Sequence, residues 1–194
     1  DRLISLDAFR GATIALMILV NNPGTWAHVY APLRHAKWHG CTLTDLVFPF
    51  FLFIVGVSMR FSFEKYDFSK WGPLFRKVFN RSITIFVIGL LLNAFPFVRQ
   101  DWDWSHFRVM GVLQRIAFAY FFASFIVARS DIKRIVKISV ALLVGYWLLL
   151  SSYGWYTGLD PYALKSNLTL VVDSLIIGSN HLYGGMGIPF DPEG

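Results

Sequence analysis

Long runs of apolar residues restrict what this chain of 194 residues can fold into. A helix that crosses a membrane needs about 20 mainly apolar residues, and residues 138–153 (ISVALLVGYWLLLSSY) form the clearest such run. Hydrophobic residues make up 55% of the chain, against about 45–50% in typical soluble proteins. A soluble globule of this size would expose large apolar patches. The composition therefore argues against a soluble enzyme, a disordered tail and a nucleic-acid-binding module.

About five runs fit transmembrane helices, which predicts an all-α, polytopic integral membrane helix bundle. The first run, residues 11–20, reaches spanning length only if Asp7 and Arg10 belong to the same helix. The other four runs are residues 46–59, 82–98, 109–127 and 138–153. We expect residues 1–194 to form a single transmembrane domain.

Lys and Arg residues are distributed unevenly over the loops between these runs. Cytoplasmic loops of membrane proteins carry the positive excess. Residues 60–81 and 129–137, together with Arg2 and Arg10, hold twelve Lys and Arg residues on the side of the N-terminus. The opposite side holds five: Arg34, Lys37, Arg99, Arg108 and Lys165. We therefore expect a cytoplasmic N-terminus, and the net charge of +6 needs no nucleic acid to explain it.

Ionisable side chains inside apolar runs are costly in a membrane and are candidates for a functional site. Gln114 and Arg115 interrupt the fourth run. Arg115 either pairs with an acidic residue of a neighbouring helix or holds an anionic substrate or cofactor. Asp7 and Arg10 lie one helical turn apart, so they either form an ion pair at the interface or belong to the site.

The loop LRHAKWHGCTLTDLVFPFF holds further candidates. Thr44 can cap the second span and Asp45 can complement its positive end. His35 and Trp38 have a weaker structural explanation. An imidazole titrates near neutral pH, so His35 could take a proton from an amine or carry an acyl group. Asp45 could orient that imidazole and stabilise its charged form.

Two amides follow the first run. Asn21 and Asn22 could cap the helix end, or one of them could donate a hydrogen bond to a reacting carbonyl oxygen. His35 and His39 are four residues apart, but no cysteine or further carboxylate accompanies them at the spacing of a metal site. We therefore expect no metal.

Five sequence blocks together resemble one known family. They are SLDAFRG, MILVNNPG, LRHAKWHGCTLTDLVFPFFLFIVGVS, RVMGVLQRIAFAY and FDPEG, in this order. The chain resembles the heparan-α-glucosaminide N-acetyltransferase family of transmembrane acetyltransferases, as a bacterial-type relative. Members of this family are longer, so the resemblance implies that this chain is the N-terminal half of a longer acyltransferase domain.

The resemblance implies roles for individual residues. The family's catalytic histidine matches His35, its partner asparagine matches Asn21 with Asn22 as an adjacent alternative, and Asp45 matches the aspartate of the DLVFP block. His39 stands where relatives often carry Asn and could compete as the base. We expect further residues to bind substrate or cofactor: Asp7, Arg10, Asn22, Trp38, Gln114, Arg115, Asp191 and Glu193.

The resemblance also implies an activity. The family takes an acetyl group from cytoplasmic acetyl-CoA and delivers it to the amine of a terminal glucosamine on the other side of the membrane. We expect the same here, by direct transfer or through an acetyl-enzyme, in a bacterial inner membrane with the His35 loop facing the periplasm. Arg10, Arg60 and Arg81 are candidates for the CoA phosphates. Expected partners are acetyl-CoA, an amino sugar, membrane lipid and the C-terminal remainder of the domain, and a homodimer is possible. The alternative function is a transporter or channel for a small anionic or sugar solute.

Overall fold

The computed structural model describes residues 3–63, 66, 71–95, 103–185 and 187–192. Within them the chain is helical, and its only β pairing is an isolated bridge between Tyr183 and Phe190. The α-helices are α1 (Ile4–Asn21), α2 (Val47–Phe63), α3 (Trp71–Asn93), α4 (Val112–Arg129), α5 (Ile132–Thr157) and α6 (Leu168–Ile176). Short 3₁₀ turns are η1 (Trp26–His28), η2 (Ala31–Leu33), η3 (Thr44–Leu46), η4 (Trp104–His106) and η5 (Ser179–His181). The expected all-α class is confirmed.

Four helical segments of the described chain are long and apolar enough to cross a membrane. They are Ile4–Asn21, Thr44–Phe63, Val112–Arg129 and Ile132–Thr157. The first confirms that Asp7 and Arg10 continue the same helix as residues 11–20. The run at 82–98 is helical as far as Asn93, within α3, but α3 is not among the four. Its first half carries three basic residues, Arg76, Lys77 and Arg81, which reduce its apolar character.

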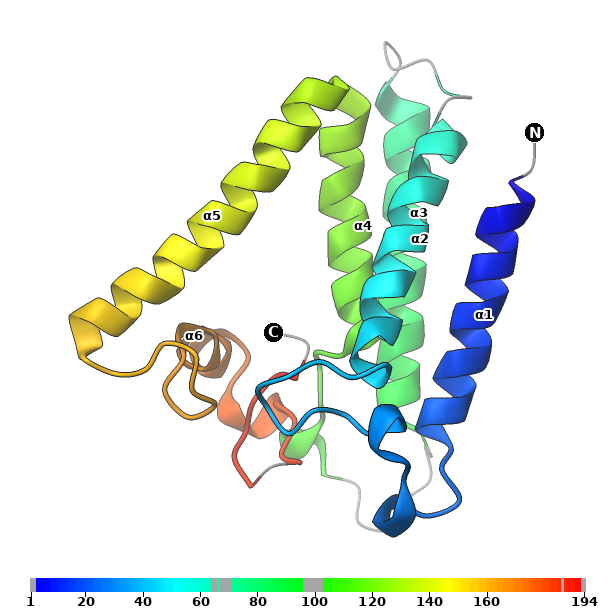
Figure 1. Cartoon of the computed structure of the whole chain (residues 1–194). Coiled ribbons are helices and arrows are strands. Elements are labelled where there is room, and N and C mark those ends of the chain that lie inside the picture. Colours follow the sequence, from blue (N-terminus) through cyan, green and yellow to red (C-terminus); the bar gives the residue numbers. More distant parts are fainter. Residues whose placement is uncertain (1–2, 64–65, 67–70, 96–102, 186, 193–194) are drawn as a thin grey trace. The chain divides into compact units, whose positions relative to one another are not determined.

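The chain divides into two compact units, Asp1–Tyr66 and Asp67–Gly194. In the first unit, α1 and α2 run side by side in opposite directions (Figure 1). The ring of Phe9 packs edge-on against Phe50 and Phe53, with centroids 5.2 and 6.2 Å apart. Arg10 donates a hydrogen bond across the pair to the hydroxyl of Ser58 at 3.0 Å. The end of α1 therefore lies at the same end of this pair as η3, where α2 begins.

In the second unit, α3 and α4 pack against each other along their length (Figure 1). Phe75 contacts Phe121 and Phe125 of α4, with ring centroids 6.4 and 6.2 Å apart. Gly89 permits a closer approach farther along, because a Cβ atom at this position would lie 2.8 Å from the amide of Gln114. A glycine is thus required in α3 where Gln114 faces it.

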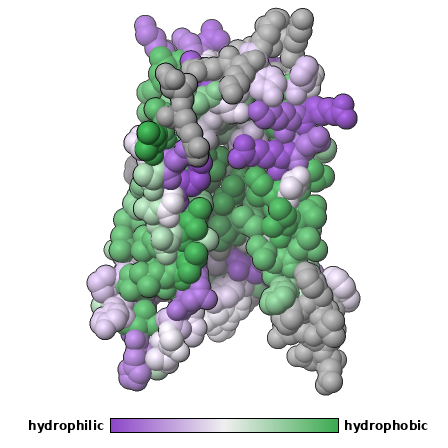
Figure 2. Space-filling view, turned by 90° about the vertical axis from the view of Figure 1, so that its right-hand side faces the viewer, coloured by the Kyte–Doolittle hydropathy of each residue, from purple (hydrophilic) through white to green (hydrophobic). Residues whose placement is uncertain are grey.

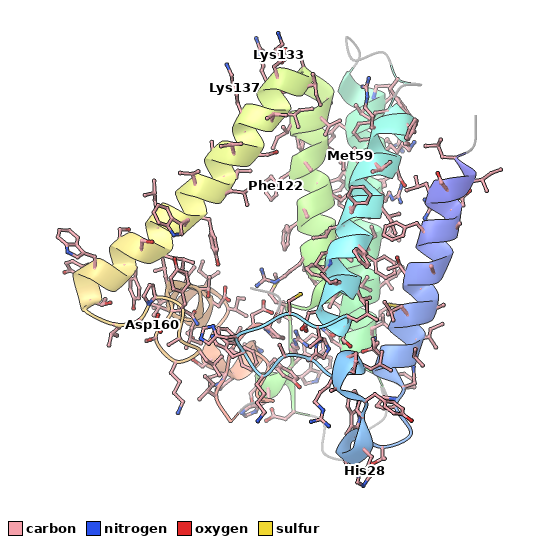
Figure 3. The ribbon with its side chains drawn as sticks, viewed as in Figure 1. His28, Met59, Phe122, Lys133, Lys137 and Asp160 are labelled. Atoms are coloured by element: carbon pink, nitrogen blue, oxygen red, sulfur yellow. The ribbon has the colours of Figure 1, made fainter. Side chains whose placement is uncertain are left out.

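The exposed surface of α5 is apolar. Large hydrophobic side chains such as Leu142, Leu143 and Trp147 are more than half exposed along it, as expected for a helix that meets lipid. Figure 2 shows hydrophobic side chains along the middle of the helices and hydrophilic ones toward their ends. Lys133 and Lys137 project from the first turns of α5 and Asp160 follows its other end (Figure 3).

Candidate functional site

His35 and Asp45 form a hydrogen-bonded pair within the first unit. His35 Nδ1 lies 2.7 Å from Asp45 Oδ1. An ionised carboxylate can only accept a hydrogen bond, so the imidazole carries a proton on Nδ1, and in the neutral ring Nε2 then presents its lone pair. The His35 side chain is 66% exposed, so Nε2 is accessible to a reactant. This arrangement of a base and an orienting carboxylate suits general-base or nucleophilic catalysis.

Asp45 is held in place by the loop that leads into α2. Its Oδ2 accepts hydrogen bonds from the Thr42 backbone N–H at 2.8 Å and from the Thr42 hydroxyl at 2.9 Å. The Ala36 backbone N–H donates to the same oxygen at 3.2 Å. These three donors occupy Oδ2 and leave Oδ1 directed at His35. Asp45 therefore orients the imidazole, as the sequence suggested.

Thr42 is a site residue that the sequence analysis did not single out. Thr42 lies three residues before Asp45, the spacing of a capping box, in which the later side chain accepts from the backbone N–H of the earlier residue. The Thr42 hydroxyl donates to the same carboxylate oxygen. Thr44, which was expected to cap the second span, is buried instead. Its hydroxyl has no hydrogen-bond partner in the described part of the chain.

The other candidates of the first unit are placed as follows. Asn21 and Asn22 end α1, and their side-chain amides donate to the carbonyl oxygens of Met17 at 2.9 Å and Ile18 at 2.8 Å. Each amide therefore closes the helix end and retains a second N–H. Trp38 is 38% exposed in the loop after His35. His39 is exposed and forms no hydrogen bond among the described residues, so the structure pairs Asp45 with His35 rather than with His39.

Asp7 and Arg10 form the ion pair that their spacing suggested. Arg10 Nη1 lies 2.9 Å from Asp7 Oδ1, and Nη2 donates to Ser58. Arg10 thus connects Asp7, one turn earlier in α1, to Ser58 of α2. A helix advances about 1.5 Å per residue, so Asp7 and Asn21 are roughly 21 Å apart along α1.

In the second unit, Arg115 pairs with a carboxylate 76 residues later in the chain. Arg115 Nε donates to Asp191 Oδ2 at 3.1 Å, and a terminal nitrogen of Arg115 contacts the same oxygen. The Asp191 side chain is only 1% exposed. Arg108 lies 3.8 Å from the other carboxylate oxygen. Of the two alternatives for Arg115, this geometry corresponds to the ion pair.

Asp173 of α6 is a third member of this charged group, 3.9 Å from Arg115. Burial raises the pKa of Asp173, Arg115 opposes the rise, and Asp191 adds to it. A second carboxylate therefore shares the positive charge of Arg115. Asp173 could not be identified from the sequence, because nothing in the nine residues of α6 indicates its distant partner.

Gln114 points away from this group and into the α3–α4 interface. It is 1% exposed and its Nε2 has no partner in the described part of the chain. Glu193 lies outside the described residues. The expected site residues thus divide between the two units, with the His35–Asp45 pair in one and Gln114, Arg115 and Asp191 in the other. Among the residues described, no group of three or more His, Cys, Asp and Glu side chains is placed to hold a metal ion.

Comparisons with known proteins agree with the first four sequence blocks, and the fifth, FDPEG, lies beyond the match to the family model. Residues 2–169 match the family model described as "Heparan-alpha-glucosaminide N-acetyltransferase, catalytic". The chain is 37% identical over 123 residues to the Homo sapiens protein named "Heparan-alpha-glucosaminide N-acetyltransferase", and 36% identical over 124 residues to its Mus musculus counterpart. Each match covers 62% of this chain and 18% of the relative, so the matched stretch is about a fifth of those proteins. The chain belongs to the heparan-alpha-glucosaminide N-acetyltransferase catalytic family.

Proposed function

We propose that this chain carries the acetyl-transfer centre of a transmembrane acetyltransferase. The donor is acetyl-CoA and the acceptor is the amine of a glucosamine-type sugar on the non-cytoplasmic side. The hydrogen-bonded pair of His35 and Asp45 carries this proposal, since it presents an oriented, accessible imidazole nitrogen in a member of this family. The names of the human and mouse relatives support an acetyl group as the cargo and an amino sugar as the acceptor.

In the direct route, the sugar nitrogen attacks the thioester carbonyl carbon and the C–S bond breaks. His35 Nε2 takes the proton that the nitrogen loses, and CoA leaves as its thiolate. Asp45 stabilises the resulting imidazolium through its bond to Nδ1. Asn21, with its second amide N–H, donates to the carbonyl oxygen as negative charge develops there, a role typically worth about 10²–10³ in rate.

In the alternative route, His35 Nε2 itself attacks the thioester carbonyl. CoA leaves, and the acetyl group stays on the imidazole until the sugar amine displaces it. Incubating the full protein with acetyl-labelled acetyl-CoA in the absence of sugar distinguishes the two routes. Label retained on His35 after rapid quench supports the acetyl-enzyme, and its absence supports direct transfer.

The test of the activity itself is acetyl transfer from acetyl-CoA to glucosamine by the full protein in detergent or proteoliposomes. Turnover that depends on both substrates is the expected result. A transporter or channel would instead move a solute without consuming acetyl-CoA. Such a protein would use Asp7 and Arg115 to line its path, whereas each of these side chains has an oppositely charged partner here.

Thr42→Val is expected to lower kcat/KM for acetyl transfer by about tenfold. The variant keeps the backbone donor to Asp45 but removes the hydroxyl donor, and a hydrogen bond to a charged group contributes about 1.5–3 kcal/mol. Thr42→Ser is the matched control, because serine restores the hydroxyl and should recover most of the activity. A loss in Thr42→Ser together with wild-type activity in Thr42→Val would show that Thr42 acts through packing of its methyl group, which valine keeps, rather than through Asp45.

Arg10 of the first unit and Arg81 of the second differ in how far their guanidinium groups are already engaged, which bears on which of them binds the CoA phosphates. Arg10 is engaged by Asp7 and Ser58. Arg81 lies over the ring of Tyr120, 5.1 Å from its centroid, which leaves its guanidinium edge available to an anion. We therefore favour Arg81 over Arg10.

The proposed sidedness is tested by cysteine labelling in membranes. Cys41 is the natural cysteine of this chain and is exposed, so the experiment starts from Cys41→Ser. Lys133→Cys, at the start of α5, should react with an impermeant maleimide only from the cytoplasmic side (Figure 3). Lys37→Cys, two residues after His35, should react only from the opposite side, which is the periplasm if the membrane is a bacterial inner membrane. The reverse pattern would contradict both the orientation and the direction of transfer.

A further inference from the structure

A second histidine–aspartate pair lies in the second unit, in and beside η4. His106 Nδ1 is 2.7 Å from Asp103 Oδ2, the same separation as between His35 Nδ1 and Asp45 Oδ1. Both imidazole side chains are 66% exposed. The proposed acetyl transfer uses only the pair at His35, so the pair at His106 has no role in it.

Local hydrogen bonds hold the second pair in a fixed shape. Asp103 precedes η4, and its Oδ1 accepts a hydrogen bond from the Ser105 backbone N–H at 2.8 Å. Hydrogen bonds from the Ser105 hydroxyl, from His106 and from the Ser105 N–H lower the pKa of Asp103 to about 2. The carboxylate is therefore ionised near neutral pH and places the His106 proton on Nδ1. The His106 side chain itself is 66% exposed.

An exposed indole ring lies between these two side chains in the sequence. Trp104 is 69% exposed, and it packs against Phe107 with ring centroids 5.8 Å apart. His181 Nδ1 donates to the Phe107 carbonyl oxygen at 2.7 Å, which ties the end of this turn to η5. The turn thus presents an exposed indole ring, an ionised carboxylate and an exposed imidazole on a backbone that is anchored within its unit.

We propose that Asp103, Trp104 and His106 form a binding site for an amino-pyranose within the second unit. The C–H face of a pyranose ring packs on an aromatic ring, and its hydroxyl groups donate to acceptors at the ring edge. The protonated amine of glucosamine is attracted by an indole face and by an ionised carboxylate. The choice of glucosamine as the ligand rests on the proposed function, whereas the choice of the three residues rests on the geometry of the turn.

An exposed tryptophan has a second common use, as an anchor at the membrane interface. The neighbours of Trp104 oppose that use. Asp103 is ionised, and moving a charged carboxylate toward the acyl boundary is costly. The His106 acceptor would likewise lose its contact with water. A sugar carries hydroxyl groups and a C–H face, which are the partners that a carboxylate or an imidazole and an indole ring bind.

The test measures equilibrium binding of radiolabelled glucosamine to the full protein in detergent without acetyl-CoA. Trp104→Ala and His106→Ala should each weaken binding, Trp104→Ala by about tenfold or more. Trp155→Ala is the matched control, because Trp155 is 90% exposed near the end of α5 and should leave binding unchanged. Size-exclusion profiles establish that each variant is folded, and His106→Ala decides the matter alone if Trp104→Ala aggregates.

Unchanged glucosamine binding in the folded variants overturns the proposal. It is also overturned if Trp104→Ala reduces only the partitioning of the protein into liposomes, which identifies a membrane anchor. Failure of the proposed function has a different signature: the wild-type protein does not transfer acetyl groups, yet its glucosamine binding still depends on Trp104 and His106. The two proposals therefore fail separately.

Discussion

His35→Ala is expected to lower acetyl transfer by about 10²–10⁴-fold, the range typical of a positioned general base. Protein yield and acetyl-CoA binding should stay close to wild type. The side chain is 66% exposed and its described hydrogen bond is to Asp45, so its removal costs little packing. The measurement is kcat with labelled acetyl-CoA and glucosamine, combined with an acetyl-CoA dissociation constant for each variant.

His39→Asn is the control for this experiment and should be close to wild type. His39 is exposed in the same loop but makes no hydrogen bond within the described residues, so no carboxylate orients it. If His35→Ala keeps substantial turnover while His39→Asn loses it, the base has been assigned to the wrong imidazole. Asp45→Asn should fall between the two, because an amide at this position no longer stabilises the charged imidazole.

Arg115→Leu is expected to cost about 3–5 kcal/mol of stability, the range found when one partner of a buried ion pair is removed. The Asp191 carboxylate is 1% exposed and would lose its contact with Arg115, while Arg108 lies farther away, at 3.8 Å. Partial exposure of Arg115, at 26% of its side chain, places the expected loss at the lower end of that range. The measurement is the thermal unfolding midpoint in detergent, together with the yield of monodisperse protein.

Arg134→Leu is the matched control, because it also removes an arginine that pairs with an aspartate. Arg134 and Asp131 are 74% and 61% exposed, and exposed pairs contribute about 0–1 kcal/mol. Its midpoint should therefore stay near that of the wild type. A wild-type midpoint for Arg115→Leu would show that Asp191 is solvated in the folded protein.

The apolar runs predicted four of the membrane-spanning helices because a bilayer imposes length and composition on any helix that crosses it. They were less informative for α3. The helix begins at Trp71, well before the apolar run at 82–98, and its basic residues lie in this earlier part. The apolar run therefore marked only part of a longer helix.

The sequence also brought His35 and Asp45 into one hypothesis because both lie in one short loop, where few conformations separate them. The partner of Arg115 could not be found this way. Asp191 is 76 residues farther along the chain, and its approach depends on how the segment after α6 packs. The donors to Asp45 were missed for a third reason: two of the three are backbone N–H groups, which every residue except proline possesses.

The unequal lengths of α4 and α5 have a consequence for the membrane around them. With a rise of about 1.5 Å per residue, the 18 residues of α4 extend roughly 27 Å and the 26 residues of α5 roughly 39 Å. A hydrocarbon core of about 30 Å matches the shorter helix when it stands upright, and a longer helix reduces the mismatch by tilting. Figure 1 shows α5 inclined to α4 after the short connection between them. The inclination is compatible with two helices of different length in one bilayer, and we expect longer or shorter lipid acyl chains to change the angle that α5 adopts.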